Sequence, residues 1–104
     1  MRWYKDLYLG SSVKNRKRYY KYCISYSKKL TGTYCIVLSQ NGGDLLDICH
    51  SELMRFHNAF PEEPLILGIA GSRSEACLLA GDILLDVFRK TGGFDVRTYF
   101  HERE

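Results

Sequence analysis

No stretch of this sequence approaches the roughly 18 consecutive apolar residues that a membrane-spanning helix needs. The start of the chain, MRWYKDLYLGSSVKNRKRYY, also lacks the apolar segment and the small-residue cleavage site of a secretory signal. We therefore expect a cytoplasmic protein with no membrane contact. The 104 residues have room for one modest core, so we expect residues 1–104 to form a single domain.

The sequence also lacks the cysteine and histidine spacings that hold metal ions. Cys23, Cys35, Cys49 and Cys77 contain no C-x-x-C pair, and each lies in an apolar segment, where a free cysteine behaves as a small hydrophobic residue. The three histidines do not complete the four compactly spaced ligands of a structural zinc site. We expect free thiols, no metal and no cofactor.

No catalytic motif is recognisable, and an enzyme is the less favoured interpretation. Asp82 and Asp86 lie four residues apart in a predicted helix, and Lys90 follows at the same spacing. This pattern is more typical of a solvated helix face with one ion pair than of two catalytic carboxylates. No serine or cysteine stands in a known nucleophile signature. We therefore assign no catalytic residue.

Charge is distributed unevenly along the chain. Residues 1–30 carry nine Lys or Arg and one acid, Asp6, for a net charge of +8. Residues 31–104 carry six Lys or Arg and eleven Asp or Glu, for a net charge of −5. Such an asymmetry is typical of a segment that binds nucleic acid or a membrane surface, and equally of two parts of one domain that attract each other. Composition leaves both interpretations open.

The basic segment predicts a helix over residues 11–30. Its apolar residues recur at helical spacing, and Ser11 or Ser12 can cap its N-terminus. Thr31 and Gly32 end it, because glycine accepts the left-handed conformation that follows a last helical turn.

The next segment predicts an antiparallel hairpin. Residues 33–39 (TYCIVLS) are typical of a central strand, and residues 40–43 (QNGG) of a tight turn. Residues 44–50 (DLLDICH) then form the returning strand. A helix from Asp44 to about His57 is the alternative, which we favour less because the double glycine is the stronger local signal.

Residues 51–60 predict a short helix or an irregular crossing, which the prolines of residues 61–64 end. Four of its side chains are expected to be buried: Leu53, Met54, Phe56 and Phe60.

The C-terminal part predicts a strand, a helix and a second strand. Residues 65–70 (LILGIA) are typical of a buried strand, and Ser72 with Glu75 matches a capping box at a helix start. Residues 92–93, both glycine, end the helix, and residues 94–100 are expected to form the last strand. Two strands joined by one helix are expected to be parallel.

Together these elements predict an α/β fold, with α+β as the alternative. The expected sheet is mixed and four-stranded, with an N-terminal basic helix, an antiparallel hairpin and a parallel strand–helix–strand unit. Residues 33–39 and 65–70 are expected to be its central strands.

The loop between the predicted strand and helix is a candidate anion site. Gly71, Ser72 and Arg73 lie where backbone N–H groups at a helix start can bind phosphate or carboxylate. The letters GSRS after an apolar strand resemble the nucleotide-binding loop of Rossmann-like families, although G-x-G-x-x-G and Walker A spacing are missing. A plain turn capped by Ser72 and Glu75 explains the same letters, and we favour it.

The basic helix is a candidate nucleic-acid site. Its cations can neutralise phosphates, and its tyrosines can stack on unpaired bases. A solvated helix face with some tyrosines in the core explains the same pattern. The cations are Lys14, Arg16, Lys17, Arg18 and Lys21, interleaved with Tyr19, Tyr20, Tyr22 and Tyr26.

A protein partner or a second copy of the chain is the leading expectation. The chain has eight tyrosines, and Arg2, Trp3 and Tyr4 suggest an exposed start. Trp, Tyr and Arg are the residues that most often anchor interfaces. We therefore expect a small non-enzymatic interaction or regulatory module, with a homodimer as one form it can take.

The whole chain resembles a group of small uncharacterised proteins of Gram-positive anaerobic bacteria. The resemblance implies a stand-alone cytoplasmic bacterial domain, and it implies no activity, cofactor or site residue. The segments that carry it are Arg2-Trp3-Tyr4, Leu7-Tyr8, Gly10, Asn41-Gly42, Leu46-Asp47-Ile48, residues 65–70, Glu75-Ala76 and residues 90–94.

Overall fold

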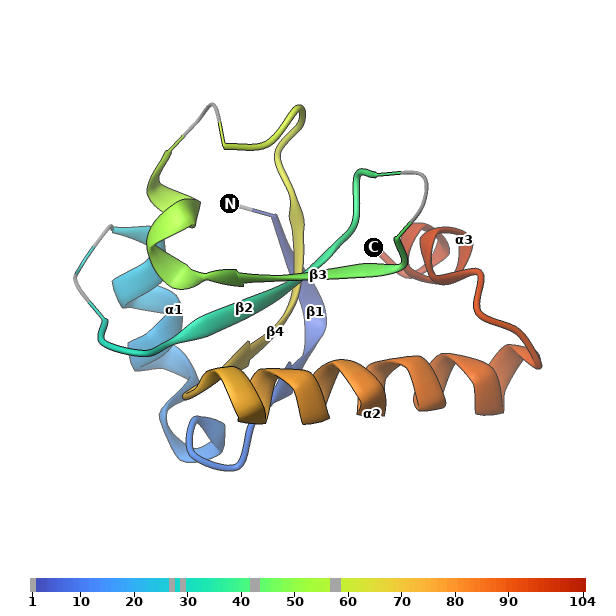
Figure 1. Cartoon of the computed structure of the whole chain (residues 1–104), viewed down its shortest axis with the longest axis horizontal. Helices are drawn as coiled ribbons and strands as arrows, with labels where there is room; N and C mark the ends of the chain where they lie inside the picture. The colour runs from blue at the N-terminus through green and yellow to red at the C-terminus, as the bar shows by residue number, and fades with distance from the viewer. Residues whose placement is uncertain (1, 27, 29, 42–43, 57–58) are drawn as a thin grey trace.

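The computed structural model describes residues 2–104 except 27, 29, 42–43 and 57–58. Four strands form one sheet, and helices pack against it (Figure 1). With η for a 3-10 helix, the elements in chain order are β1 Arg2–Leu9, η1 Lys14–Arg16, α1 Lys17–Ser25, β2 Tyr34–Leu38, β3 Leu46–His50, η2 Ser51–Arg55, β4 Leu65–Ala70, α2 Arg73–Thr91 and α3 Val96–Glu102.

The sheet is mixed, as the sequence predicts. Its order is β1-β4-β2-β3, with β1 parallel to β4 and the other two pairs antiparallel. The predicted central strands are therefore confirmed as β2 and β4. Every residue of β4 is buried, which explains why its sequence is uniformly apolar.

The predicted hairpin is confirmed. β2 and β3 pair in register, with Cys35 opposite Cys49 and Leu38 opposite Leu46. The alternative helix from Asp44 is wrong, because residues 46–50 are a strand. The predicted turn glycines, residues 42–43, lie outside the described residues.

The fourth strand is the N-terminal β1, and the sequence does not predict it. Its pairing with β4 shifts between Trp3 and Tyr8, so the alternation of a regular strand is interrupted. Lys5 and Asp6 are exposed in this interrupted stretch. A strand with two charges at its centre has a weak local signal, and β4 supplies the pairing that stabilises it.

The predicted strand over residues 94–100 is wrong, because α3 occupies residues 96–102. The Asp95 carboxylate accepts a hydrogen bond from the Thr98 N–H at 3.3 Å and so caps the helix. Val96, Tyr99 and Phe100 recur at helical spacing and are buried. The C-terminal strand–helix–strand unit is therefore a strand followed by two helices.

The ends of α2 lie where the sequence predicts them, but the predicted capping box forms only in part, because the Glu75 carboxylate accepts from the Gly71 N–H and not from the Ser72 N–H. The Ser72 hydroxyl accepts a hydrogen bond from the Glu75 N–H at 3.1 Å, which satisfies one free donor of the first turn. Gly92 ends the helix with φ of 79°, a conformation that glycine adopts without steric strain.

Substitution by alanine is expected to have opposite effects at Gly81, within α2, and at Gly92, its C-terminal cap. A Cβ on Gly81 would meet no atom within 4 Å, so Gly81→Ala should raise the free energy of unfolding by about 0.5–1 kcal/mol. Gly92→Ala should lower it by about 1 kcal/mol, because alanine is strained at positive φ. Urea unfolding of both variants measures the two changes, and equal signs would contradict this account of the helix end.

The sheet has one hydrophobic core on each face. Alternate residues of β2 point to opposite sides, so Ile36 packs beneath α2 and α3 while Cys35 packs beneath α1. Phe100, Ile83 and Val87 belong to the first core, and the α1 residues Cys23 and Ile24 to the second. Helices α1 and α2 therefore cover opposite faces of the sheet.

The predicted helix over residues 11–30 is shorter in the structure. Its α-helical part ends at Ser25, and Gly32, with φ of 68°, lies well beyond that end. Ser11 and Ser12 do not cap α1, because their hydroxyls donate to the Glu75 carboxylate instead. Long-range hydrogen bonding therefore replaces the predicted local cap.

The segment after β3 is a 3-10 helix, as its short length suggests, but only half of its predicted contacts are buried. Met54 and Phe60 pack against the core beneath α1. Leu53 and Phe56 are 42% and 58% exposed, so the prediction of their burial is wrong. In the part of the chain that the structure describes, no helix is long and apolar enough to cross a bilayer.

Candidate nucleic-acid interface

A row of three tyrosines lies along the solvent side of α1. Tyr19, Tyr22 and Tyr26 are 44%, 53% and 67% exposed. They follow one another at spacings of three and four residues, which places them along one side of the helix. Cys23 and Ile24 pack into the core on the other side and fix this orientation. We call Tyr19, Tyr22 and Tyr26 the tyrosine row.

The rings of the tyrosine row are held close to one another and to a cation. The ring centroids of Tyr22 and Tyr26 are 5.0 Å apart, with an interplanar angle of 43°. The Arg16 guanidinium lies over the Tyr19 ring at 4.2 Å from its centroid. Cation–π contact of this kind keeps a positive charge beside an exposed aromatic face.

The predicted cations share η1 and α1 with the tyrosine row, and Arg16 and Lys21 each have a ring contact, Arg16 with Tyr19 and Lys21 with Trp3. Lys14, Arg16 and Arg18 are exposed, whereas Lys17 and Lys21 are half-buried. None of the five forms an ion pair with a described residue. The sequence has no Asp or Glu between Asp6 and Asp44, so no acid within this stretch can compensate them. The structure thus brings all five cations together on η1 and α1.

Tyr20, the fourth tyrosine of the candidate nucleic-acid site, does not belong to the tyrosine row. Tyr20 is half-buried and packs against the core beneath α1. Its ring meets that of Tyr19 edge to face, with centroids 5.5 Å apart. Tyr20 therefore supports the tyrosine row from below and presents little of its own surface.

The N-terminal residues that suggested an exposed interface are largely covered. Tyr4 is only 5% exposed, and its ring packs edge-on against Phe100 with centroids 4.9 Å apart. The half-buried Trp3 has the Lys21 ammonium over its ring at 5.3 Å. Arg2 forms an ion pair with Glu104. The expectation of an exposed start is therefore wrong for Tyr4.

The candidate anion site at residues 71–73 is filled by the protein's own carboxylate. Glu75 accepts hydrogen bonds from the Gly71 N–H at 2.9 Å and from the Ser12 hydroxyl at 2.8 Å. The Ser12 N–H and the Ser11 hydroxyl lie farther away, at 3.4 and 3.5 Å. The hydrogen bond from the Gly71 N–H is the main cause that lowers the pKa of Glu75.

The Glu75 carboxylate joins the ends of two parallel strands. Ser12 follows β1 and Gly71 follows β4, so one side chain holds both turns. A Cβ on Gly10 would collide with this carboxylate, and one on Gly71 would collide with the Ser12 hydroxyl. These glycines leave room for the carboxylate, so the structural interpretation of the loop fits better than a ligand site.

The lowered pKa of Glu75 predicts that the free energy of unfolding depends on pH. Its pKa is lowered from the ordinary value of 4.5 in the folded chain, so its contribution is complete above that value. The contribution is lost as the pH falls through the lowered pKa. Glu75→Gln should reduce the free energy of unfolding by about 1 kcal/mol at pH 7.

Urea unfolding of Glu75→Gln from pH 7 to pH 2 measures this contribution, and its deficit should shrink at acid pH. Glu102→Gln is the matched control, because Glu102 is exposed at the end of α3. A deficit that stays constant with pH would show that the Glu75 charge plays no part.

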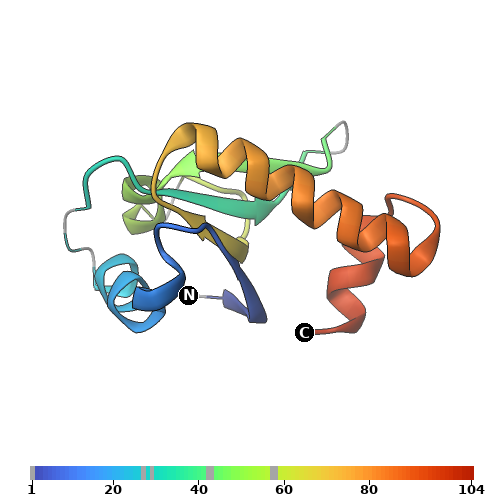
Figure 2. The ribbon, with the colours of Figure 1, turned by 90° about the horizontal axis from the view of Figure 1, so that it is seen from below.

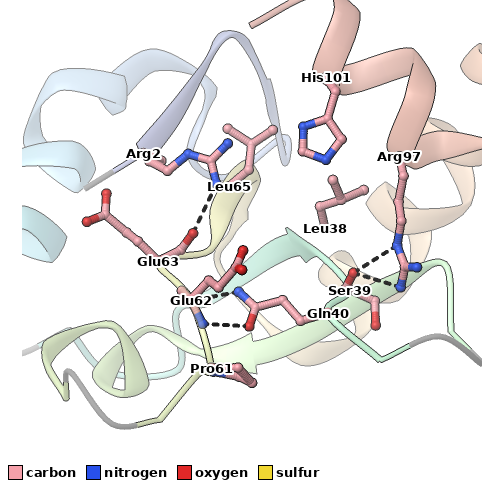
Figure 3. A pocket seen from close by; sticks show the side chains of 10 residues that line it. All are labelled: Arg2, Leu38, Ser39, Gln40, Pro61, Glu62, Glu63, Leu65, Arg97 and His101. Carbon is pink, nitrogen blue, oxygen red and sulfur yellow. Dashed lines mark hydrogen bonds between the residues drawn. The ribbon is translucent and has the colours of Figure 1, made fainter.

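A hollow of about 280 Å³ lies beside the starts of β1 and β4 (Figure 3). Its cations are engaged by the chain itself. The Arg97 guanidinium donates to the Ser39 carbonyl at 3.1 Å, and Arg2 donates to the Glu63 carbonyl at 3.1 Å. These bonds join α3 and β1 to the neighbouring loops, so we interpret the hollow as a structural joint.

The acidic residues of α2 match the predicted ion pair. The Asp86 carboxylate accepts a hydrogen bond from the Lys90 ammonium at 3.3 Å and another from the Tyr8 hydroxyl. The Tyr8 hydrogen bond is the main cause that lowers the pKa of Asp86. No group of three or more potential metal ligands occurs among the residues the structure describes.

The fold is that of a small α/β domain, and its most distinctive surface is a cationic helix with exposed tyrosines. No protein-family model matches the chain, and no curated protein or solved structure is significantly similar to it. The resemblance to small proteins of Gram-positive anaerobes therefore stays a prediction.

Proposed function

We propose that this domain binds single-stranded nucleic acid through η1 and α1. One observation carries the proposal: five cations without an ion pair among the described residues share η1, α1 and its C-terminal cap with three exposed tyrosines. Neither property alone would suffice, because cations also serve solubility and tyrosines also serve cores. Their combination on one short segment is the chemistry of a single-strand binding platform.

The geometry favours a single strand over a duplex. An aromatic ring binds a base through its face, and base faces are accessible only when the strand is unpaired. The rings of Tyr19, Tyr22 and Tyr26 follow one another at spacings of three and four residues, and each is 44% to 67% exposed for contact with a base. The flanking lysines and arginines then neutralise the backbone phosphates between these bases.

Fluorescence polarisation with labelled oligonucleotides tests the proposal. If all five cations contact phosphates, the affinity should fall about a hundredfold between about 50 and 200 mM salt, from a slope of about −0.7 per phosphate. Tyr22→Ala should weaken binding by about 1–3 kcal/mol, the typical value of one stacked base. A duplex of the same length should bind more weakly than the single strand.

Two control variants lie away from α1. Arg73→Ala removes an exposed cation at the start of α2, and Phe94→Ala removes an exposed aromatic ring near its end. Neither should change the affinity for an oligonucleotide short enough to occupy a single site more than slightly. No binding at low salt, or equal losses from control and α1 variants, would refute the proposal.

A protein-interaction module that pairs with itself is the second candidate function. The observation that favours it is a row of exposed apolar side chains on α2, which packs against the opposite face of the sheet from α1. Sedimentation velocity over a range of protein concentrations tests it, because self-association raises the mean mass as concentration rises. A constant monomer mass would exclude self-pairing.

A further inference from the structure

The outer side of α2 carries a row of apolar side chains that the rest of the described chain leaves open. Leu78, Leu85 and Phe88 are 73%, 49% and 45% exposed. Phe94, 47% exposed, extends the row, because its ring stacks on Phe88 with centroids 5.1 Å apart. Figure 2 shows α2 along its whole length with no other helix in front of it. We call Leu78, Leu85, Phe88 and Phe94 the α2 row.

Two opposite charges accompany the α2 row on the same side of the helix. Asp82 and Arg89 are exposed and lie seven residues apart, which is about two helical turns. Neither forms an ion pair with another described residue. An acid and a base at this spacing are complementary to the same pair on an antiparallel copy of the helix.

We propose that a second copy of this chain covers the α2 row, with the two α2 helices antiparallel about a two-fold axis between Leu85 and Asp86. Asp82 lies three residues before Leu85, and Arg89 lies three residues after Asp86. The axis therefore places Asp82 of each copy opposite Arg89 of the other. The proposal deepens the second candidate function and is independent of nucleic-acid binding.

The same axis gives the interface an apolar centre. Leu85 of the two copies meets at the axis, with Phe88 of each copy one turn away on the same flank. Leu78 reaches the end of the partner helix, where Phe94 stacks on Phe88. An apolar centre between reciprocal ion pairs is typical of an isologous interface, which requires a self-complementary surface.

This arrangement leaves α1 of both copies open. Because α1 and α2 cover opposite faces of the sheet, pairing through α2 keeps each tyrosine row at the surface of the dimer. Two such sites on one particle would bind a long single strand more tightly than either site alone.

Sedimentation velocity of matched variants tests the surface. The wild-type chain should form a dimer, and Leu85→Glu should raise its dissociation constant about a hundredfold or more. Leu53→Glu is the control, because it makes the same change at an exposed leucine of η2, which contacts α1 on the opposite side of the sheet from α2. It should leave the dimer intact. Far-UV circular dichroism confirms that each variant is folded.

Charge exchange tests the register. Asp82→Arg and Arg89→Asp should each weaken the dimer about tenfold or more, and the double variant should restore it, because the exchanged charges again face opposite partners. A dimer that Leu85→Glu leaves intact, or a double variant no better than either single one, would overturn the proposal. A wild-type chain that stays monomeric would overturn both the α2 dimer and the second candidate function, self-pairing.

Discussion

Phe100→Ala is expected to lower the free energy of unfolding by about 3–5 kcal/mol, the usual cost of removing a fully buried aromatic ring. Phe100 is completely buried, and its ring meets those of Tyr4 and Tyr99 at centroid distances of 4.9 Å. The ring therefore ties α3 to β1, the strand that the sequence does not predict. Urea or thermal unfolding measures the loss.

Phe94→Ala is the matched control for this effect. Phe94 is 47% exposed in the single chain, so its replacement should change the free energy of unfolding of the monomer by less than about 1 kcal/mol. A strand over residues 94–100 would point both phenylalanines to the same face and make the two losses similar. A helix from Val96 separates them, so similar losses would contradict the structure. Phe100→Leu, with a smaller expected loss, keeps the comparison possible if Phe100→Ala does not fold.

The second large expected effect is a difference in reaction rate between the exposed thiol of Cys77 and the three buried thiols. Cys77 is exposed on α2 and should react with a thiol reagent at the rate of a free cysteine. Cys23, Cys35 and Cys49 are buried and should react at least about 10³-fold more slowly, because the chain must open before the reagent reaches them. Burial also raises the pKa of the Cys49 thiol to about 12, so little reactive thiolate is present.

Counting thiols with a chromogenic disulfide reagent measures this difference. One thiol should react quickly in buffer, and all four should react in denaturant. Cys77→Ser should remove the fast phase and leave the slow phases unchanged. A second fast thiol in the native protein would show that the core beneath α1, which holds all three buried cysteines, is open to the reagent.

Local signals in the sequence were sufficient for the middle of the fold. The uniform apolar run of residues 65–70 predicted β4, because a strand covered on both faces needs no polar alternation. Ser72 and Gly92 marked the ends of α2, because each satisfies backbone groups of its own helix. The hairpin followed from residues 33–50 for the same reason: the interactions that form it are close in the sequence.

The candidate site was predictable in composition but not in exposure. The sequence showed five cations and four tyrosines in one segment, and the structure leaves three of those tyrosines exposed and half-buries the fourth. Arg2, Trp3 and Tyr4 suggested an interface equally well, yet Tyr4 lies in the core. Exposure depends on what other elements cover a side chain, and composition does not contain that information.

Residue patterns are sufficient to predict the mixed sheet, its two central strands, the main helix with Ser72 and Gly92 at its ends, and the concentration of charge in residues 1–30. Three features emerge only from contacts in the folded chain: β1 completes the sheet, residues 96–102 form α3, and the Glu75 carboxylate binds the Gly71 N–H of the loop. The physical reason is the same in all three cases. Partners distant in the sequence stabilise each feature: β4 pairs with β1, Tyr4 packs on Phe100 of α3, and Ser12 donates to Glu75.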